Sequence, residues 1–176
     1  NSKSTDSNYV LAVRGATASG QVSLASTGQS TSHASGDDGD LQKGVAWPDP
    51  RFTDNGNGTI TDHLTGLVWD QNGNRFGEEN WESAVSDCYG LVLGGHSDWR
   101  LPNIHELESL IHVGEEDTYN WLNAEAFDNM NYSFYWTSTT HASATDRAIS
   151  VNMSEGDNGS GLKTNSNHVI AVRDGP

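Results

Sequence analysis

Short apolar and aromatic stretches, separated by turns rich in glycine and asparagine, recur along much of the chain. Residues 147–153 alternate strictly, and residues 134–139 are rich in aromatic residues and threonine, so both stretches predict β-strands. Residues 51–62 contain two Asn-Gly pairs, which predict a hairpin, and residues 64–69 predict a further strand. The alternation places Ile149, Val151 and Met153 on one strand face and Ala148, Ser150 and Asn152 on the other. Residues 168–173 are apolar on both faces, which is typical of a central strand.

Two stretches between these strands have the spacing of short amphipathic helices with good N-caps. Asn80 precedes the first, in which Trp81, Ala84, Val85 and Cys88 share one face. Asn103 precedes the second, and Glu106 completes a capping box. The apolar stripe of the second helix consists of Leu107, Leu110 and Ile111. Two short helices followed by a run of antiparallel strands predict an α+β fold.

The segment after the second helix, up to residue 132, is predicted to be a loop that carries large aromatic residues. Such loops pack against the domain or present a binding surface. The candidate ligand-binding residues in this loop are Glu115, Glu116, Asp117, Tyr119, Trp121 and Tyr132.

The first 40 residues predict an N-terminal arm, and residues 41–176 predict the folded domain. Residues 9–13 have the pattern of a buried strand, whereas residues 15–40 have the Ser/Gly-rich composition of a linker. Residues 5–14 repeat residues 164–173, with seven of the ten positions identical. The candidate assembly residues are Tyr9, Val10, Leu11, Ala12 and Val13 together with Val169, Ile170, Ala171 and Val172. Two explanations remain open: the first copy is the tail of a preceding tandem domain, or it is a spare strand that docks into another subunit's sheet.

The net charge of −15 disfavours nucleic acid and anionic membranes as partners, because both would be repelled. The acidic side chains either keep the protein soluble outside the cell or hold Ca²⁺, which takes several oxygen ligands. The candidate calcium ligands are Asp37, Asp38, Asp40, Asp54 and Asp62. No apolar run approaches the length needed to insert into a membrane.

Catalytic motifs are missing from the sequence. The seven histidines include no H-E-x-x-H pair, and neither a nucleophile elbow nor a P-loop occurs. A single cysteine, Cys88, excludes an intrachain disulfide and is predicted to be a small core residue. We therefore expect a protein that is not an enzyme.

Four motifs in order resemble the Lcl C-terminal domain family, named for the end domain of a bacterial collagen-like adhesin. They lie at residues 51–59, 64–69, 94–103 and 135–139, and the resemblance extends over roughly residues 36–175. The resemblance implies a C-type lectin-like fold in which the N- and C-terminal strands pair and long loops carry binding. It also implies a secreted or surface-attached prokaryotic protein. The founding member binds sulfated polysaccharides, a ligand class that the acidity of this chain does not favour.

Two functions are therefore expected, both extracellular. The first is a structural subunit that self-assembles into a filament or array, because a strand donated head-to-tail gives a contact that propagates. The second is a carbohydrate-binding or adhesin module of the cell surface. The expected partners are accordingly other copies of the chain in the first case and glycans in the second.

Overall fold

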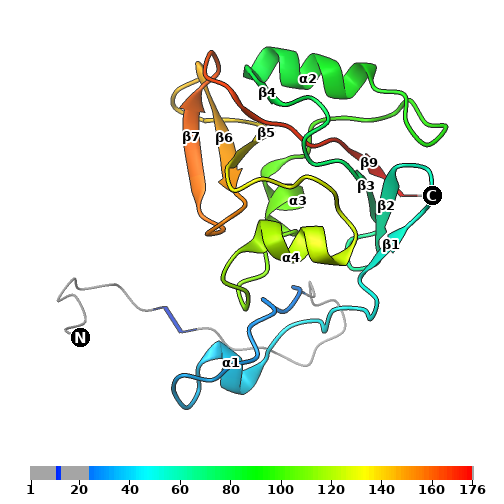
Figure 1. The fold of residues 1–176 in the computed structure, drawn as a ribbon. Helices are drawn as coiled ribbons and strands as arrows, with labels where there is room; N and C mark the ends of the chain where they lie inside the picture. The colour runs from blue at the N-terminus through cyan, green and yellow to red at the C-terminus, as the bar shows by residue number, and fades with distance from the viewer. Residues whose placement is uncertain (1–10, 13–23, 176) are drawn as a thin grey trace, which may run out of the picture.

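The computed structural model describes residues 11–12 and 24–175, which form short helices and two β-sheets (Figure 1). The helices are α1 (Asp38–Leu41), α2 (Trp81–Gly90), α3 (Ile104–Glu108) and α4 (Thr118–Glu125). The strands are β1 (Phe52–Asp54), β2 (Thr59–Asp62), β3 (Leu67–Asp70), β4 (Glu78–Glu79), β5 (Phe134–Thr140), β6 (Arg147–Asn152), β7 (Asn158–Leu162), β8 (Asn167–His168) and β9 (Val172–Asp174). The fold is α+β, as predicted. None of the helices in the described part of the chain is long and apolar enough to cross a membrane.

The two sheets are joined by the last segment of the chain. The first sheet is antiparallel, with the order β1-β2-β3-β9. The second has the order β4-β8-β5-β6-β7, in which only β5 and β8 run parallel. Since β8 belongs to the second sheet and β9 to the first, residues 169–171 carry the chain from one sheet to the other.

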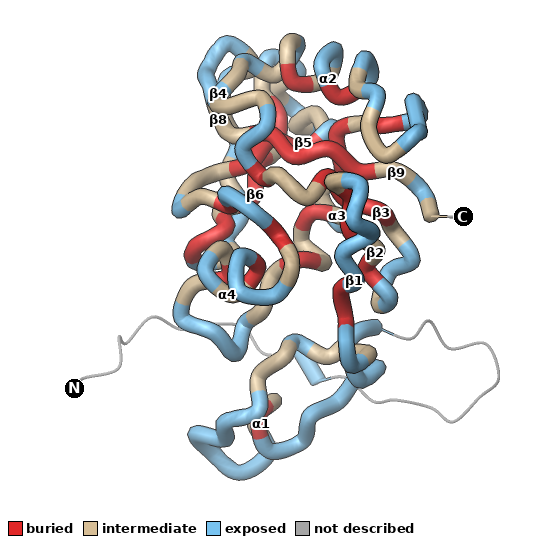
Figure 2. The backbone as a smooth tube through the Cα atoms, turned by 45° about the vertical axis from the view of Figure 1, so that its right-hand side comes forward, coloured by how far each residue is buried: buried red, intermediate tan, exposed pale blue. Residues whose placement is uncertain are grey.

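The core has two clusters, and the last segment contributes to both of them. One cluster contains Trp69, Leu107, Tyr135, Ile170 and Val172 among its buried residues. The other contains Cys88, Trp99, Trp136, Val169 and Ala171. Successive side chains of this segment therefore enter different halves of the core, which is the two-sided burial that its apolar pattern predicts. Figure 2 shows buried backbone through the middle of the two-sheet body.

Local signals in the sequence predict the hairpin and the helix starts correctly. Strands β1 and β2 pair across the Asn-Gly turn. The Asn80 side chain accepts a hydrogen bond from the Ser83 amide at the start of α2. Asn103 and Glu106 form the complete capping box of α3. These elements form where predicted because a few neighbouring residues specify each of them.

Two elements differ from the prediction. The predicted loop after α3 contains helix α4, whose buried residues are Thr118 and Leu122. Strand β7, whose sequence Asn-Gly-Ser-Gly-Leu has the composition of a turn and is not predicted as a strand, pairs along β6. Packing against the domain, rather than intrinsic propensity, stabilises both elements.

Two predicted strands also need correction. Strand β6 is buried on both faces, because Ala148 and Ser150 are as well buried as Val151. The predicted single strand at residues 168–173 is divided between β8 and β9. Residues Leu11 and Ala12, predicted to lie in a buried strand, are exposed and outside any strand, while Tyr9, Val10 and Val13 lie outside the described residues.

Residues 24–50 form an arm that lies at one end of the two-sheet body (Figure 1). Asp37 caps α1 by accepting from the Asp40 amide, and a parallel bridge joins Ala25 to Val45. The arm is mostly exposed (Figure 2). The mostly exposed stretch thus runs from residue 24 to residue 50 and includes residue 41, the expected start of the domain.

Candidate functional site

The segment formed by residues 167–174, which we call the terminal segment, is bonded along both of its edges. The Val172 amide donates to the Arg100 carbonyl, and the Arg100 amide donates to the Val172 carbonyl, each at 2.9 Å. On the other edge, the Asp70 amide of β3 donates to the Ala171 carbonyl at 3.0 Å. The side chains of Val169, Ile170, Ala171 and Val172 have no exposed surface. In this conformation the middle of the terminal segment, at Ala171 and Val172, has backbone hydrogen bonds on both sides.

Polar contacts fix both ends of the terminal segment. The Arg173 guanidinium donates to the Asp98 carboxylate from Nε at 2.8 Å and from Nη2 at 3.1 Å, and this pairing lowers the pKa of Asp98. At the other end the His168 ring stacks on Tyr135, with centroids 5.3 Å apart, and its Nδ1 lies 3.1 Å from Asn74 Oδ1. Burial lowers the pKa of His168. The segment is thus held by packing in its middle and by polar groups at its ends.

The N-terminal copy of this sequence has a different environment at the two positions that the structure describes. Leu11 corresponds to Ile170, yet Leu11 is 95% exposed and Ile170 is 0% exposed. Ala12 corresponds to Ala171 and is likewise exposed, whereas Ala171 is buried. Leu11 and Ala12 therefore lie in solvent, whereas their counterparts Ile170 and Ala171 lie in the core.

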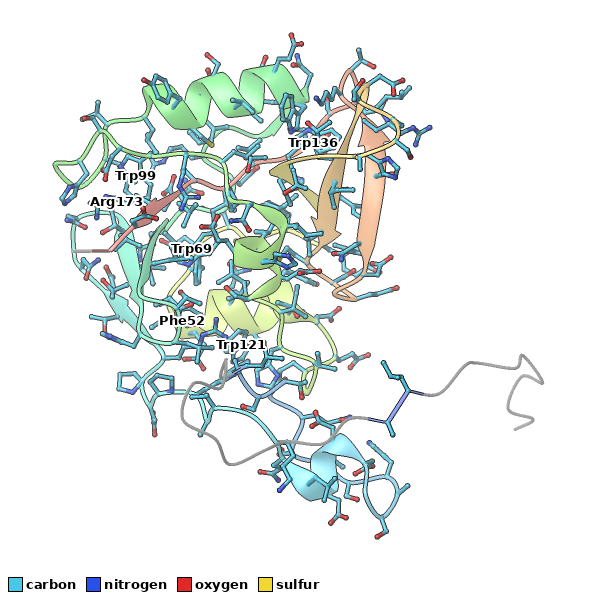
Figure 3. The ribbon with its side chains drawn as sticks, turned by 180° about the vertical axis from the view of Figure 1, so that it is seen from behind. Phe52, Trp69, Trp99, Trp121, Trp136 and Arg173 are labelled. Atoms are coloured by element: carbon cyan, nitrogen blue, oxygen red, sulfur yellow. The ribbon has the colours of Figure 1, made fainter. Side chains whose placement is uncertain are left out.

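A cluster of aromatic rings attaches the arm to the domain. The Trp47 ring lies 4.7 Å from the His112 ring and 5.5 Å from the Trp121 ring, measured between centroids. The Arg51 guanidinium lies over the Trp47 ring at 4.4 Å and forms a buried pair with Asp62. Burial in this cluster lowers the pKa of His112. Figure 3 shows Trp121 beside Phe52 at the end of the domain that faces the arm.

The candidate ligand-binding residues fall into separate groups. Trp121 is half-buried and packs on the arm, so it belongs to the attachment cluster. Tyr119 and Tyr132 form an edge-to-face pair, with centroids 5.7 Å apart, and Tyr132 is 63% exposed. Glu115 and Glu116 are exposed and Asp117, at the start of α4, is half-buried. The structure therefore pairs two of the three predicted aromatic residues on the surface.

The five candidate calcium ligands do not gather in one place. Asp37 accepts from the amides of His33, Ala34 and Asp40, and these hydrogen bonds lower its pKa to about 2. Nearby, the Asp38 carboxylate accepts from the Thr27 hydroxyl, and the Asp40 carboxylate accepts from the Gly36 amide. The Asp54 carboxylate accepts from the Gly56 amide. Asp62 forms an ion pair with Arg51. Among residues 11–12 and 24–175, no three His, Cys, Asp or Glu side chains are arranged to hold a metal ion.

An apolar groove of about 630 Å³ lies between the arm and the domain. Its apolar lining includes Leu24, Val45, Trp47, Leu64, Ile111 and Val113. Leu24, Val45 and Val113 are exposed. The sequence does not predict this groove, because its walls come from residues 24–27, 45–47, 64–65, 108–113 and 156, and no local pattern joins them.

The comparisons with known proteins concern the two-sheet body. A model of the Lcl C-terminal domain family matches residues 58–173. No curated protein matches the sequence. The match runs from the hairpin turn to Arg173, so the terminal segment is part of the family's domain and the arm lies outside it. With two thirds of its length in this match, the chain belongs to the Lcl C-terminal domain family.

Proposed function

We propose that the protein is a non-enzymatic, extracellular structural subunit that assembles with other copies through its N-terminal segment, residues 5–14. Membership of the Lcl C-terminal domain family suggests a cell-surface module of adhesin type. We further infer a C-type lectin-like architecture, which is supported by the mixed fold and by the terminal segment that joins the two sheets.

The exposure of Leu11 is the observation that carries this proposal. A leucine side chain gains about 1.5–3 kcal/mol when it moves from water into an apolar environment. Leu11 is 95% exposed and stands in the sequence Val-Leu-Ala-Val, whose counterpart at residues 169–172 is buried completely. A surface that covers the N-terminal segment would therefore be stabilising, and another copy can supply that surface.

The position of this segment in the sequence favours an open assembly. The N-terminal segment and the surface that receives it are different parts of the molecule, so each copy can donate to one neighbour and receive from another. Such heterologous contacts form rings when the rotation closes and filaments when it does not. A filament or array at the cell surface is the expected product.

Removing residues 1–15 tests the proposal. The full chain should sediment as larger species as its concentration rises, whereas the truncated chain should remain a monomer with an unchanged melting temperature. Leu11→Asp should reduce assembly strongly, because it places a charge in the buried contact. Val92→Asp, at another exposed apolar residue, should have no effect. Equal assembly of the full and truncated chains would contradict the proposal.

The pair of tyrosines supports a second candidate function, carbohydrate binding. Exposed Tyr132 packs edge to face on half-buried Tyr119 of α4, and the acidic residues 115–117 directly precede this helix. Tyr132→Ala should abolish binding on a glycan array, with and without Ca²⁺, while Tyr89→Ala should leave binding intact. Tyr89 is a suitable control because it is also exposed but lies on α2. Absence of binding to any glycan by the unmodified chain would exclude this function.

A further inference from the structure

The structure gives a packing or pairing role to four of the seven identical positions of the repeat. Four identical positions, Val169, Ala171, Val172 and Arg173, correspond to Val10, Ala12, Val13 and Arg14. The first three of these are fully buried, and Arg173 forms the two hydrogen bonds to Asp98. The N-terminal segment therefore retains the side chains by which the terminal segment contacts the domain.

Three positions differ between the two copies, and the substitution is conservative at the one that is fully buried, Ile170. Ile170 is replaced by its isomer leucine at position 11, so the volume that enters the core is kept. His168, which stacks on Tyr135, is replaced by another ring at Tyr9. The third difference, Asn165 to Asp6, falls at an exposed position before β8. None of the three changes removes a group that the buried contacts require.

The two-sided burial also specifies the register. Ala171 enters the cluster around Trp99 and Trp136, whereas Ile170 enters the cluster around Trp69 and Tyr135. A slip of one residue would exchange the two sets of side chains between the clusters. The N-terminal segment has the same order of small and large residues, with Ala12 following Leu11. It therefore matches the surroundings of residues 167–174 in a single register.

We propose that the N-terminal segment of one copy binds in the place that the terminal segment occupies in a second copy, so that copies associate by exchanging this segment. This inference rests on the proposed function and names its receiving surface. Since the middle of the terminal segment is hydrogen-bonded on both sides and fully buried, entry requires that the resident segment leave. The apolar surface that the resident segment then exposes is close to that which the entering segment buries, because the two sequences are nearly the same, so exchange is nearly balanced in free energy and a high protein concentration favours it, as in domain swapping.

The apolar groove beside Leu24 is a weaker candidate for the receiving surface. The lining of the groove is apolar but shows no correspondence to the sequence of the N-terminal segment. The site that residues 167–174 occupy, in contrast, already holds a segment of nearly the same sequence. The site of the terminal segment also contains the Asp98 carboxylate, which binds Arg173 and could bind its counterpart Arg14 in the same way. Figure 3 shows Arg173 near Trp99, at the end of the domain that lies away from the arm.

Charge substitutions in the full-length chain test the inference. Ala171→Glu puts a carboxylate into the cluster around Trp136 and should expel the resident segment. We expect this variant to stay folded by accepting residues 5–14 from a second copy, so its melting temperature should rise with protein concentration. Ala12→Glu alone should melt like the unmodified chain. The double variant Ala12→Glu/Ala171→Glu should lose its cooperative transition, because neither segment then fits.

A further variant provides the matched control. Leu24→Glu combined with Ala171→Glu should behave like Ala171→Glu, because Leu24 lines the groove and not the place of the terminal segment. Equal unfolding of Ala171→Glu with and without Ala12→Glu would overturn the inference. Rescue by the N-terminal segment at a melting temperature that does not depend on concentration would also overturn it, since the segment would then come from the same chain. In either case, loss of assembly on deleting residues 1–15 would still support the proposed function.

Discussion

At the scale of single residues, Arg51 is a charged side chain that is almost completely buried. Its side chain is 3% exposed, and its guanidinium is held between the Trp47 and Phe52 rings and the Asp62 carboxylate. It also donates to the Ser109 carbonyl at 2.6 Å. Its Nη1 has no hydrogen-bond partner, so the aromatic rings and Asp62 must compensate for the buried charge.

Asp62→Ala should therefore be strongly destabilising. The substitution leaves the Arg51 charge buried without its partner, which costs about 3–5 kcal/mol of unfolding free energy. Urea denaturation would measure this loss. The matched control is Asp174→Ala, because Asp174 also pairs with an arginine, Arg100, but is 82% exposed. It should change stability by about 1 kcal/mol or less. Similar losses for both variants would contradict this view of Arg51.

His168 makes stability depend on pH. Burial lowers the pKa of His168 in the folded protein below its value of 6.5 in the unfolded chain. Protons therefore bind the unfolded state first, so stability is complete above pH 6.5 and falls as the pH drops toward the folded pKa. His168→Phe keeps a ring against Tyr135 and cannot titrate, so its melting temperature should fall less between pH 7 and pH 5.

His112 provides the internal reference for this experiment. Its pKa is lowered by burial in the same way, so part of the pH dependence should persist in His168→Phe. Glu78 lies 3.4 Å from His168 and opposes the effect of burial, because a negative charge favours the protonated ring. An identical pH profile for the variant and the unmodified chain would contradict the assignment.

At the scale of elements, prediction from sequence works where the information is local. The Asn-Gly pairs specify the β1–β2 hairpin, and Asn80 and Asn103 specify where α2 and α3 begin. Helix α4 is missed because its residues form no clear apolar stripe, and only Thr118 and Leu122 are buried. Strand β7 is missed because its composition is that of a turn, and only pairing with β6 makes it a strand.

The glycines of β7 show why its composition misleads. A Cβ added to Gly161 would lie 2.9 Å from the Trp136 ring, and one added to Gly159 would lie 3.0 Å from the Phe134 ring. Each glycine thus leaves room for an aromatic ring of strand β5, which lies beyond β6 in the sheet. The residues that predict a turn are required here by close packing across the sheet.

Gly161→Ala should destabilise the domain by about 1–3 kcal/mol, because the added methyl group would displace the Trp136 ring from the core. Gly90→Ala is the matched control, since its Cβ would meet nothing within 4 Å and Gly90 lies in helix α2. That substitution should be neutral or slightly stabilising. Chemical denaturation would measure both values. A loss no greater for Gly161→Ala than for Gly90→Ala would contradict the packing argument.

At the scale of the whole molecule, the sequence predicts the duplicated segment but not the contacts that the second copy makes in the fold. The repeat is visible in the residues themselves, and the two-sided burial of residues 169–172 follows from their unbroken apolar character. The division of this segment between two sheets could not be predicted, because it depends on Arg100 and β3, which are distant in sequence. The attachment of the arm through Trp47 was missed for the same reason.

The candidate site was predicted only in part. Tyr119 and Tyr132 meet on the surface, as the aromatic content of their segment suggests, whereas Trp121 turns toward the arm. The candidate calcium ligands were chosen for their charge alone. In the structure, backbone amides, the Thr27 hydroxyl and Arg51 bind to all five of them, which a one-dimensional pattern of acidic residues cannot show.

In the proposed assembly the N-terminal segment, of which Leu11 and Ala12 are exposed in a single copy, becomes covered by a second copy. Hydrogen exchange of the full chain at a low and a high protein concentration measures this directly. The amides of residues 10–14 should exchange at least about tenfold more slowly at the higher concentration, because assembly gives them partners. Unchanged exchange of these amides while larger species form would contradict the claim.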